Sequence, residues 1–241
     1  LGMQKRGQVT IYIILGIVVL VAFGFLISVQ FDLFKSEFEK ELELNVVPLQ
    51  LIPVKSYMDS CISDVVTDAV FTLSSRGGYL NLPEDILPRS INNPFSNSLE
   101  LYPGSEVAYW FYESANGLQK EQVPSIESME IEIENYIYNE FSSCYPELSF
   151  YENEGFEINL PSYVSPSINI ESNHIEIIID APTNIRLDEV SKELQKYVLK
   201  IDVPLGSLYE KSKEIFFEES ENDFLEEITI DVLAVYEEIP Y

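Results

Sequence analysis

Histidine and cysteine, the side chains that most often bind transition metals, are scarce in this sequence. Its 241 residues include one histidine, His174, and two cysteines, Cys61 and Cys144. A structural zinc site has four ligands, usually cysteine and histidine, so these three residues do not form one without carboxylates. The sequence also has no cysteine cluster suited to haem. We therefore assign no metal ligands and expect no cofactor.

Recognisable catalytic motifs are absent too. The sequence contains no Gly-rich phosphate loop, no HExxH and no GxSxG. Ser-His-Asp catalysis would have to use His174, which lies in a predicted turn between strands, where a solvated histidine is expected. Carboxylate pairs are too numerous among the 41 acids to single one out. We therefore assign no catalytic residues, and an enzyme that uses two carboxylates stays open as an alternative.

Positive charge is the third scarcity. The chain has 14 Lys and Arg against 41 Asp and Glu, a net charge of −27 at pH 7. Such a surface repels nucleic acid phosphates, so no nucleic acid partner is expected, and cations or basic partners are favoured. A solvated acidic surface is the plainer interpretation, and a salt-adapted organism is another.

The acids are all on one side of an uncharged apolar run, Val9 to Val29. Lys5 and Arg6 precede this run, and 12 basic residues and all 41 acids follow it, which gives the part after it a net charge of −29. About 20 apolar helical residues span a hydrocarbon core of about 30 Å. We predict a transmembrane helix over residues 9–30, with residues 1–8 as a cytoplasmic leader. A cleaved secretory signal, the alternative, would carry small residues where Phe23 and Phe25 stand.

The segment KRGQVTIYIILG, Lys5 to Gly16, resembles the class III signal peptides of archaeal type IV pilin-like proteins. This resemblance implies processing after Gly7, with Gln8 as the mature N-terminus and Thr10 at a hydroxyl position. Tyr12 stands where those pilins usually carry a glutamate that sets subunit register. The opening is also similar to that of single-span archaeal surface proteins with extracytoplasmic domains.

An amphipathic helix is expected after the run, over residues 31–45. Phe31, Phe34, Phe38 and Leu42 recur at steps of three or four residues, with charged residues between them. Pro48 and Pro53 then follow, and proline ends helices because it lacks the amide donor. The helix is either a stem of the pilin kind or a juxtamembrane helix resting on its own domain.

The remainder, residues 46–241, is expected to form an acidic extracytoplasmic α+β domain. Two amphipathic helices are predicted at about 53–75 and 125–144, and 79–122 is expected to be loop with a strand-like run at Val107–Tyr112. Alternating residues predict strands of an antiparallel sheet at 156–160, 168–170 and 175–179, with a turn at Glu171–His174. Further on we predict a helix at Leu187–Val198, a strand at Leu199–Val203, and helices at Leu208–Phe217 and Asp223–Tyr236.

Each cysteine lies on the apolar face of a predicted helix. Outside the membrane, Cys61 and Cys144 would form a disulfide, and two buried thiols are the alternative.

Two surface features remain. Glu218, Glu219, Glu221 and Asp223 lie between predicted helices as a solvated acidic linker, with Ca²⁺ binding through carboxylate oxygens as the weaker alternative. The aromatic run Tyr109–Tyr112 is either a carbohydrate or partner surface, or half buried in the core at strand spacing.

These features favour a membrane-anchored cell-surface protein, single-pass, with a cytoplasmic N-terminus and an outer domain that makes structural or adhesive contacts, and the resemblance implies that it is archaeal. Its partners would be membrane lipid and either further copies, as in a pilin-like subunit, or other surface proteins. The alternative is a membrane-tethered enzyme or ligand-binding receptor that uses carboxylates.

Overall fold

The computed structural model describes residues 14, 16–17, 37–83, 95–222 and 224–235. The chain divides into two compact units, Leu1–Leu44 and Asn45–Tyr241. In the first unit, α2 spans Glu37–Leu44, inside the predicted helix at 31–45. The predicted membrane span lies outside the described residues, apart from Ile14, Gly16 and Ile17, which are helical. Among the residues that the structure describes, no helix combines the length and the apolar character that crossing a bilayer requires.

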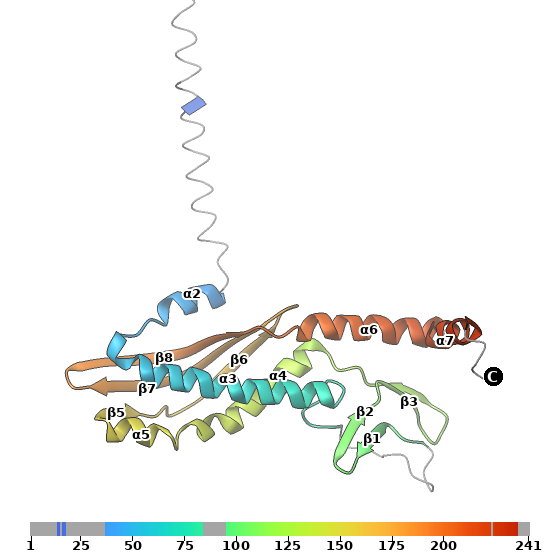
Figure 1. Cartoon of the computed structure of the whole chain (residues 1–241), viewed down its shortest axis with the longest axis horizontal. Helices are drawn as coiled ribbons and strands as arrows, with labels where there is room; N and C mark the ends of the chain where they lie inside the picture. The colour runs from blue at the N-terminus through green and yellow to red at the C-terminus, as the bar shows by residue number, and fades with distance from the viewer. Residues whose placement is uncertain (1–13, 15, 18–36, 84–94, 223, 236–241) are drawn as a thin grey trace, which may run out of the picture. The chain divides into compact units, whose positions relative to one another are not determined.

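The second unit is an α+β domain, as the sequence predicts, and its sheets are antiparallel (Figure 1). Its helices are η1 (Leu49–Leu51), α3 (Ile52–Ser75), α4 (Ile126–Glu140), η2 (Phe141–Cys144), α5 (Leu148–Asn153), α6 (Leu205–Asn222) and α7 (Phe224–Val235). Its strands are β1 (Ser98–Tyr102), β2 (Ser105–Ala108), β3 (Phe111–Glu113), β4 (Gln119–Glu121), β5 (Phe156–Asn159), β6 (Ser165–Ile170), β7 (Ile175–Leu187) and β8 (Val190–Ile201).

Helix α3 begins and ends where local chemistry requires. Pro53 occupies the first turn, where its missing amide has no partner to lose. At the other end Gly77 and Gly78 have positive φ angles of 77° and 94°. The Gly78 amide donates to the Leu73 carbonyl (2.9 Å), so the left-handed glycines close the last turn. The predicted helix at 53–75 is therefore confirmed.

Helix α4 is confirmed as well, with its predicted last turn tightened into η2. The Ser125 hydroxyl accepts a hydrogen bond from the Ser128 amide (3.1 Å) and caps the helix N-terminus. Met129, Ile133 and Ile137 follow at steps of four residues and are buried. This spacing places them on one face of the helix.

The main sheet is built around β7. Strand β8 pairs with β7 from Ile175↔Ile201 to Leu187↔Val190. Residues 175–180 of β7 also pair with β6, and residues 184–187 also pair with β5. Since a strand has two edges, β5 and β6 share the edge of β7 opposite β8. The strands predicted at 156–160, 168–170 and 175–179 are thus confirmed.

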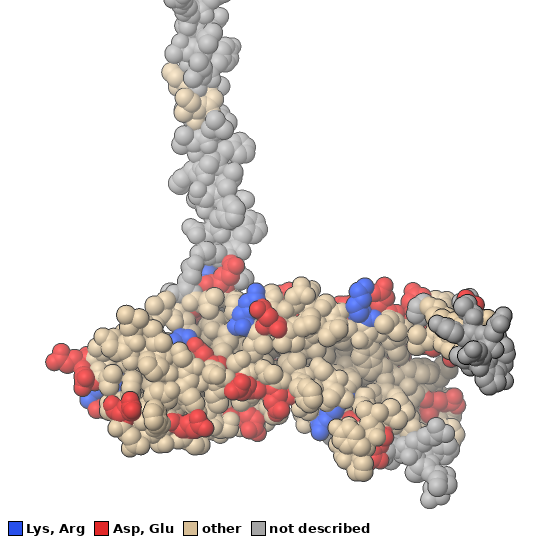
Figure 2. Space-filling view, in the orientation of Figure 1, with Lys and Arg blue, Asp and Glu red and all other residues tan. Residues whose placement is uncertain are grey.

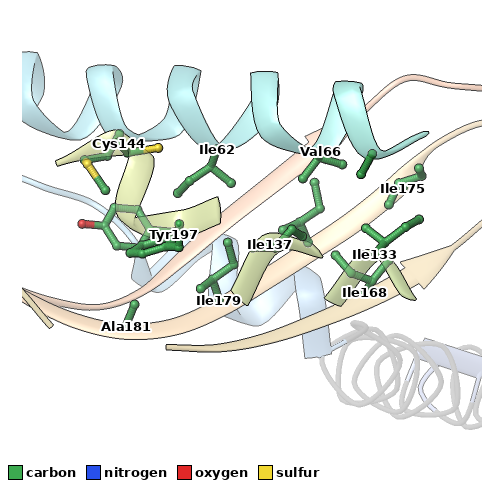
Figure 3. Close-up of a cluster of buried hydrophobic side chains, with 14 of the residues drawn as sticks. Ile62, Val66, Ile133, Ile137, Cys144, Ile168, Ile175, Ile179, Ala181 and Tyr197 are labelled. Atoms are coloured by element: carbon green, nitrogen blue, oxygen red, sulfur yellow. The ribbon is translucent and has the colours of Figure 1, made fainter. Parts of the chain in front are cut away.

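The core lies between β7 and the helices α3 and α4. The odd-numbered residues of β7 from Ile175 to Ile185 are buried, while the even-numbered ones through Asn184 are half-buried on the other face. Side chains of α3 and α4 cover the odd-numbered face, as Figure 3 shows for Ile62, Val66, Ile133 and Ile137. The domain is therefore a two-layer structure, with helices on one face of the sheet.

The predicted helix at Leu187–Val198 is wrong. Residues 190–201 form β8, the longest partner of β7, and the strand predicted at 199–203 is its end. A tight turn at Asp188 and Glu189 joins the two strands, and Asp188 has a φ of 53°. Aspartate tolerates this left-handed conformation better than most residues, which lets the chain reverse here.

Side chains of α4 also accept hydrogen bonds from the backbone amides at the outer edge of β6. Glu134 accepts a hydrogen bond from the Ile168 amide (3.0 Å), and Glu130, one turn earlier, accepts one from the Ile170 amide (2.8 Å). Alternate amides of a strand point to the same side, so two carboxylates four residues apart match two amides two residues apart. These acids close a strand edge that would otherwise offer free donors to another chain.

A disulfide between Cys61 and Cys144 joins α3 to η2, across a sequence separation of 83 residues. Cys144 is fully buried, and Figure 3 shows it above Tyr197 at one end of the core. Tyr57, one turn before Cys61 on α3, donates its hydroxyl to the Cys144 carbonyl (2.9 Å). Two positions on one face of α3 therefore hold the same residue of η2.

Removing this crosslink should destabilise the domain. We expect the double variant Cys61→Ala/Cys144→Ala to lose up to about 4 kcal/mol of unfolding free energy, because the bond closes a long loop in the unfolded chain. Urea unfolding of the oxidised protein and of the variant measures the difference. Reductant should lower the stability of the wild type and leave the double variant unchanged. Equal stability of oxidised and reduced wild type would contradict this expectation.

Candidate functional site

The residues singled out in the sequence do not gather at one place. Gly7 and Gln8, the predicted processing residues, lie outside the described residues. Cys61 and Cys144 form the disulfide described above. His174 lies at the predicted turn between β6 and β7, where its carbonyl accepts from the Glu171 amide (2.9 Å). Its Nε2 lies 3.4 Å from Glu176 Oε1, a contact between two half-buried side chains.

The prediction that this acidic cluster links two helices is wrong, although Glu218 and Glu221 are exposed, as expected of solvated acids. Glu218, Glu219 and Glu221 belong to α6, which runs on to Asn222, and Asp223 lies outside the described residues. Within the last turn of α6, Asn222 donates to the Glu218 carboxylate (3.1 Å). The Glu219 carboxylate accepts from the Leu225 amide at the start of α7 (2.6 Å). Over the described ranges, no three His, Cys, Asp or Glu residues are grouped so that they could hold a metal ion.

The aromatic run Tyr109–Tyr112 serves mainly to join elements. Trp110 donates its indole N–H to the Gly77 carbonyl (2.7 Å) at the end of α3. Its ring lies 6.1 Å from that of Tyr209 and 5.6 Å from that of Phe216, both on α6. Phe111, by contrast, is exposed. Tyr109, Trp110 and Tyr112 are half-buried and Phe111 is exposed, so the predicted alternation between core and surface is not seen in this run.

An apolar cavity of about 290 Å³ adjoins Trp110. Its walls come from the ends of α3 and α4 and from α6. The residues are Leu73, Ser74, Gly77, Gly78, Trp110, Met129, Leu205, Leu208, Tyr209 and Ser212. Two polar groups of the lining already have hydrogen-bond partners within the protein. The Trp110 indole N–H donates to the Gly77 carbonyl, and the Tyr209 hydroxyl donates to the Pro124 carbonyl (2.8 Å). The cavity thus offers little that would orient a ligand.

A second hollow lies beside the disulfide and has both aromatic and polar walls. We call it the aromatic pocket: Tyr57, Pro146, Glu147, Ser149, Phe150, Tyr151 and Asn153 line a volume of about 590 Å³. Tyr57 comes from α3, and the other residues come from the segment that follows η2 and from α5. Ligand sites in proteins commonly have this size and this mixture of apolar walls with a few polar groups.

The rings of the aromatic pocket stand at angles to one another. The Tyr57 and Tyr151 centroids are 5.8 Å apart with an interplanar angle of 47°, and the Phe150 and Tyr151 centroids are 5.4 Å apart at 87°. Tyr151 also packs edge-on against Phe156, at 5.9 Å. Phe156 is buried in β5, so it supports Tyr151 from the core side. Phe150 is 62% exposed, and its ring extends the pocket toward solvent.

The charge in the aromatic pocket comes from Glu147. Burial raises the pKa of the Tyr57 hydroxyl, and the nearby Glu147 carboxylate and Tyr151 raise this pKa further. Glu147 is exposed and lines the pocket together with Tyr57. Ser149 and Asn153 add neutral hydrogen-bonding groups at the exposed side of the pocket.

Sequence reasoning missed this site. In the sequence, Tyr57 is separated from the other aromatic residues of the pocket by the rest of α3, the strands β1 to β4 and α4. The signal that existed was the segment CYPELSFYEN, Cys144–Asn153, which places three aromatic residues and two glutamates directly after a cysteine. Only the disulfide and the fold bring Tyr57 to it.

One further ionisable group is partly buried near the disulfide. Asp59 lies on α3, and its Oδ2 contacts the Lys55 ammonium (2.5 Å). Within the described part of the chain its Oδ1 is buried without a hydrogen-bond partner. Burial raises the pKa of the Asp59 carboxyl, and the opposing effects of Lys55 are smaller. Burial also raises the pKa of Tyr197 to about 12.

Comparison with known proteins gives no relative: the chain matches no protein family, no curated protein and no solved structure.

The Asp59 carboxyl should make stability depend on pH in an uncommon direction. Because its folded-state pKa is raised, the folded protein holds this proton more tightly than the unfolded chain does. The resulting stabilisation is present below about pH 4, near the ordinary aspartate pKa, and is lost as the pH rises through the folded-state pKa. We expect Asp59→Asn to remove this component, so that the urea midpoint falls less between pH 4 and neutral pH than in the wild type.

Urea midpoints measured at a series of pH values provide the test. Glu193→Gln, at an exposed position of β8, removes the same charge and should keep the slope of the wild type. If Asp59→Asn kept that slope as well, the role given to Asp59 would be wrong.

Proposed function

We propose that this protein is a membrane-anchored archaeal cell-surface protein, whose acidic α+β domain makes structural or adhesive contacts outside the membrane. The observation that carries the proposal is the placement of charge along the chain. Lys5 and Arg6 precede the uncharged run Val9–Val29, and every acid follows it. Basic residues before an apolar span and an acidic region after it favour a cytoplasmic N-terminus and an outer domain.

The folded domain supports this proposal through its covalent chemistry. A disulfide persists in oxidising surroundings and is rare in the reducing cytosol, so the Cys61–Cys144 bond favours an outer location. Figure 2 shows Asp and Glu side chains spread over the visible face of the domain, with few Lys or Arg among them. Such a surface stays solvated and favours basic or cationic contacts.

Several glutamates on α4 have a structural role. Glu130 and Glu134 close the edge of β6, and Glu132 accepts from the Leu80 and Asn81 amides after α3. Acids that are committed to backbone amides are not available as an acid–base pair. The proposal therefore assigns contacts, and no reaction, to the domain.

A pilin-like subunit is the more specific form of the proposal. The sequence of Lys5–Gly16 supports this form, because the segment resembles a class III signal peptide with processing after Gly7. Helix α2 supports it too, since a helix lies within the predicted stem at 31–45. Tyr12 in place of the usual glutamate weighs against filament assembly.

Mass spectrometry of the N-terminus tests both forms. For protein isolated from its native membrane, we expect fragments confined to the membrane fraction, with the acidic domain open to protease added outside the cells. The pilin-like form further predicts a chain that begins at Gln8 and is recovered in sheared extracellular filaments.

Variants sharpen this measurement. Gly7→Val should block processing, whereas Gly2→Val should leave it unchanged, because Gly2 lies outside the matching motif. An uncut wild-type chain that stays in membranes would rule out the pilin-like form and keep the anchored domain. A domain that protease reaches only after cell lysis would overturn the proposal as a whole.

A further inference from the structure

The aromatic pocket has no role in the anchored, displayed domain described above. We propose that it binds a methylated ammonium group, as carried by a quaternary ammonium compound or by a trimethylated lysine side chain. This inference does not depend on where the protein resides, because every residue of the pocket belongs to the folded second unit.

Ring geometry is the first argument. An ammonium cation is attracted to the faces of aromatic rings within about 6 Å of their centroids, and methylated ammonium groups suit a cage of several rings. Tyr57, Tyr151 and Phe150 line one hollow and stand at 47° and 87° to their neighbours. Rings at such angles present surfaces in more than one direction, as a group surrounded on several sides requires. A sugar ring stacks on a flat face, and mutually inclined rings fit that ligand less well.

Charge is the second argument. Glu147, an exposed carboxylate, lines the same pocket as the three rings. A carboxylate beside the rings adds direct attraction for a cation and repels an anion. The pocket residues include no Lys or Arg, and the chain as a whole carries a net charge of −27. The field around the pocket therefore draws cations toward it.

Rigidity is the third argument. The Tyr57 hydroxyl donates to the Cys144 carbonyl (2.9 Å), so the ring is fixed at a residue that the disulfide also holds. Tyr151 packs against the buried Phe156 (5.9 Å). Two of the three rings are thus held before any ligand arrives, which lowers the ordering cost of binding.

Choline and its neutral isostere 3,3-dimethyl-1-butanol provide the test. The two molecules share the same shape and differ in charge, so the full chain in detergent micelles should bind choline at least about tenfold more tightly. Ligand-detected NMR and calorimetric titration measure both affinities. Equal binding of the two ligands, or binding of neither, would overturn the proposal. Tighter binding of methyl glucoside than of choline would overturn it as well and assign the pocket to sugars.

Variants locate the binding. Glu147→Gln should weaken choline binding several-fold and leave the isostere unaffected, because it removes a charge and little volume. Glu152→Gln is the matched control: it removes the same charge from α5, at a position that does not line the pocket. Tyr151→Leu should abolish the preference for choline, and thermal unfolding checks that this variant folds. Equal losses in Glu147→Gln and Glu152→Gln would refute the site, since they would reflect net charge alone.

A second probe distinguishes the two possible sources of the methylated ammonium group, a free compound and a protein side chain. A short peptide that carries trimethyllysine should compete with choline if the pocket reads a protein side chain, and the peptide with unmodified lysine should compete at least about tenfold less well. Competition by choline without competition by the trimethyllysine peptide would identify a free quaternary ammonium compound as the ligand class.

Discussion

Strand β7 sets the constraint on which the domain depends. Its odd-numbered residues from Ile175 to Ile185 are buried beneath α3 and α4, and its even-numbered neighbours include Glu176 and Asp180. Since side chains alternate along a strand, a slip of one residue would exchange the two sets and place carboxylates in the core. The pairing of β7 with β5, β6 and β8 therefore has one acceptable register. This register also fixes which side chains α3 and α4 pack against.

The abundance of acids has a structural explanation in part. On α4, Met129, Ile133 and Ile137 face the core, while Glu130 and Glu134 accept the outer amides of β6. The burial of Glu130 raises its pKa despite that hydrogen bond, so its use at the strand edge costs some free energy in desolvation. A count of carboxylates thus says little about chemistry here, because the fold itself uses several of them.

Sequence reasoning succeeded where the local signals for a helix were not overridden by tertiary contacts. Helices α3 and α4 carry caps and a clear apolar stripe, and both were predicted. Strand β8 failed because Val190, Leu194 and Val198 recur at steps of four among good helix formers, which is the pattern of an amphipathic helix. Pairing with β7 overrides that preference, since it satisfies backbone groups along the whole strand. The aromatic pocket was out of reach because Tyr57 meets Tyr151 only in the folded chain.

The disulfide and the aromatic pocket are connected through Cys144. Tyr57 and Cys61 lie one turn apart on α3, and both hold Cys144, one by a hydrogen bond and the other by a covalent bond. The remaining pocket residues follow Cys144 directly in the chain. The distance between the two walls is therefore fixed by the same residue that the disulfide fixes. Reduction would leave Tyr57 a single hydrogen bond to Cys144, so we expect the pocket to be best formed in the oxidised protein.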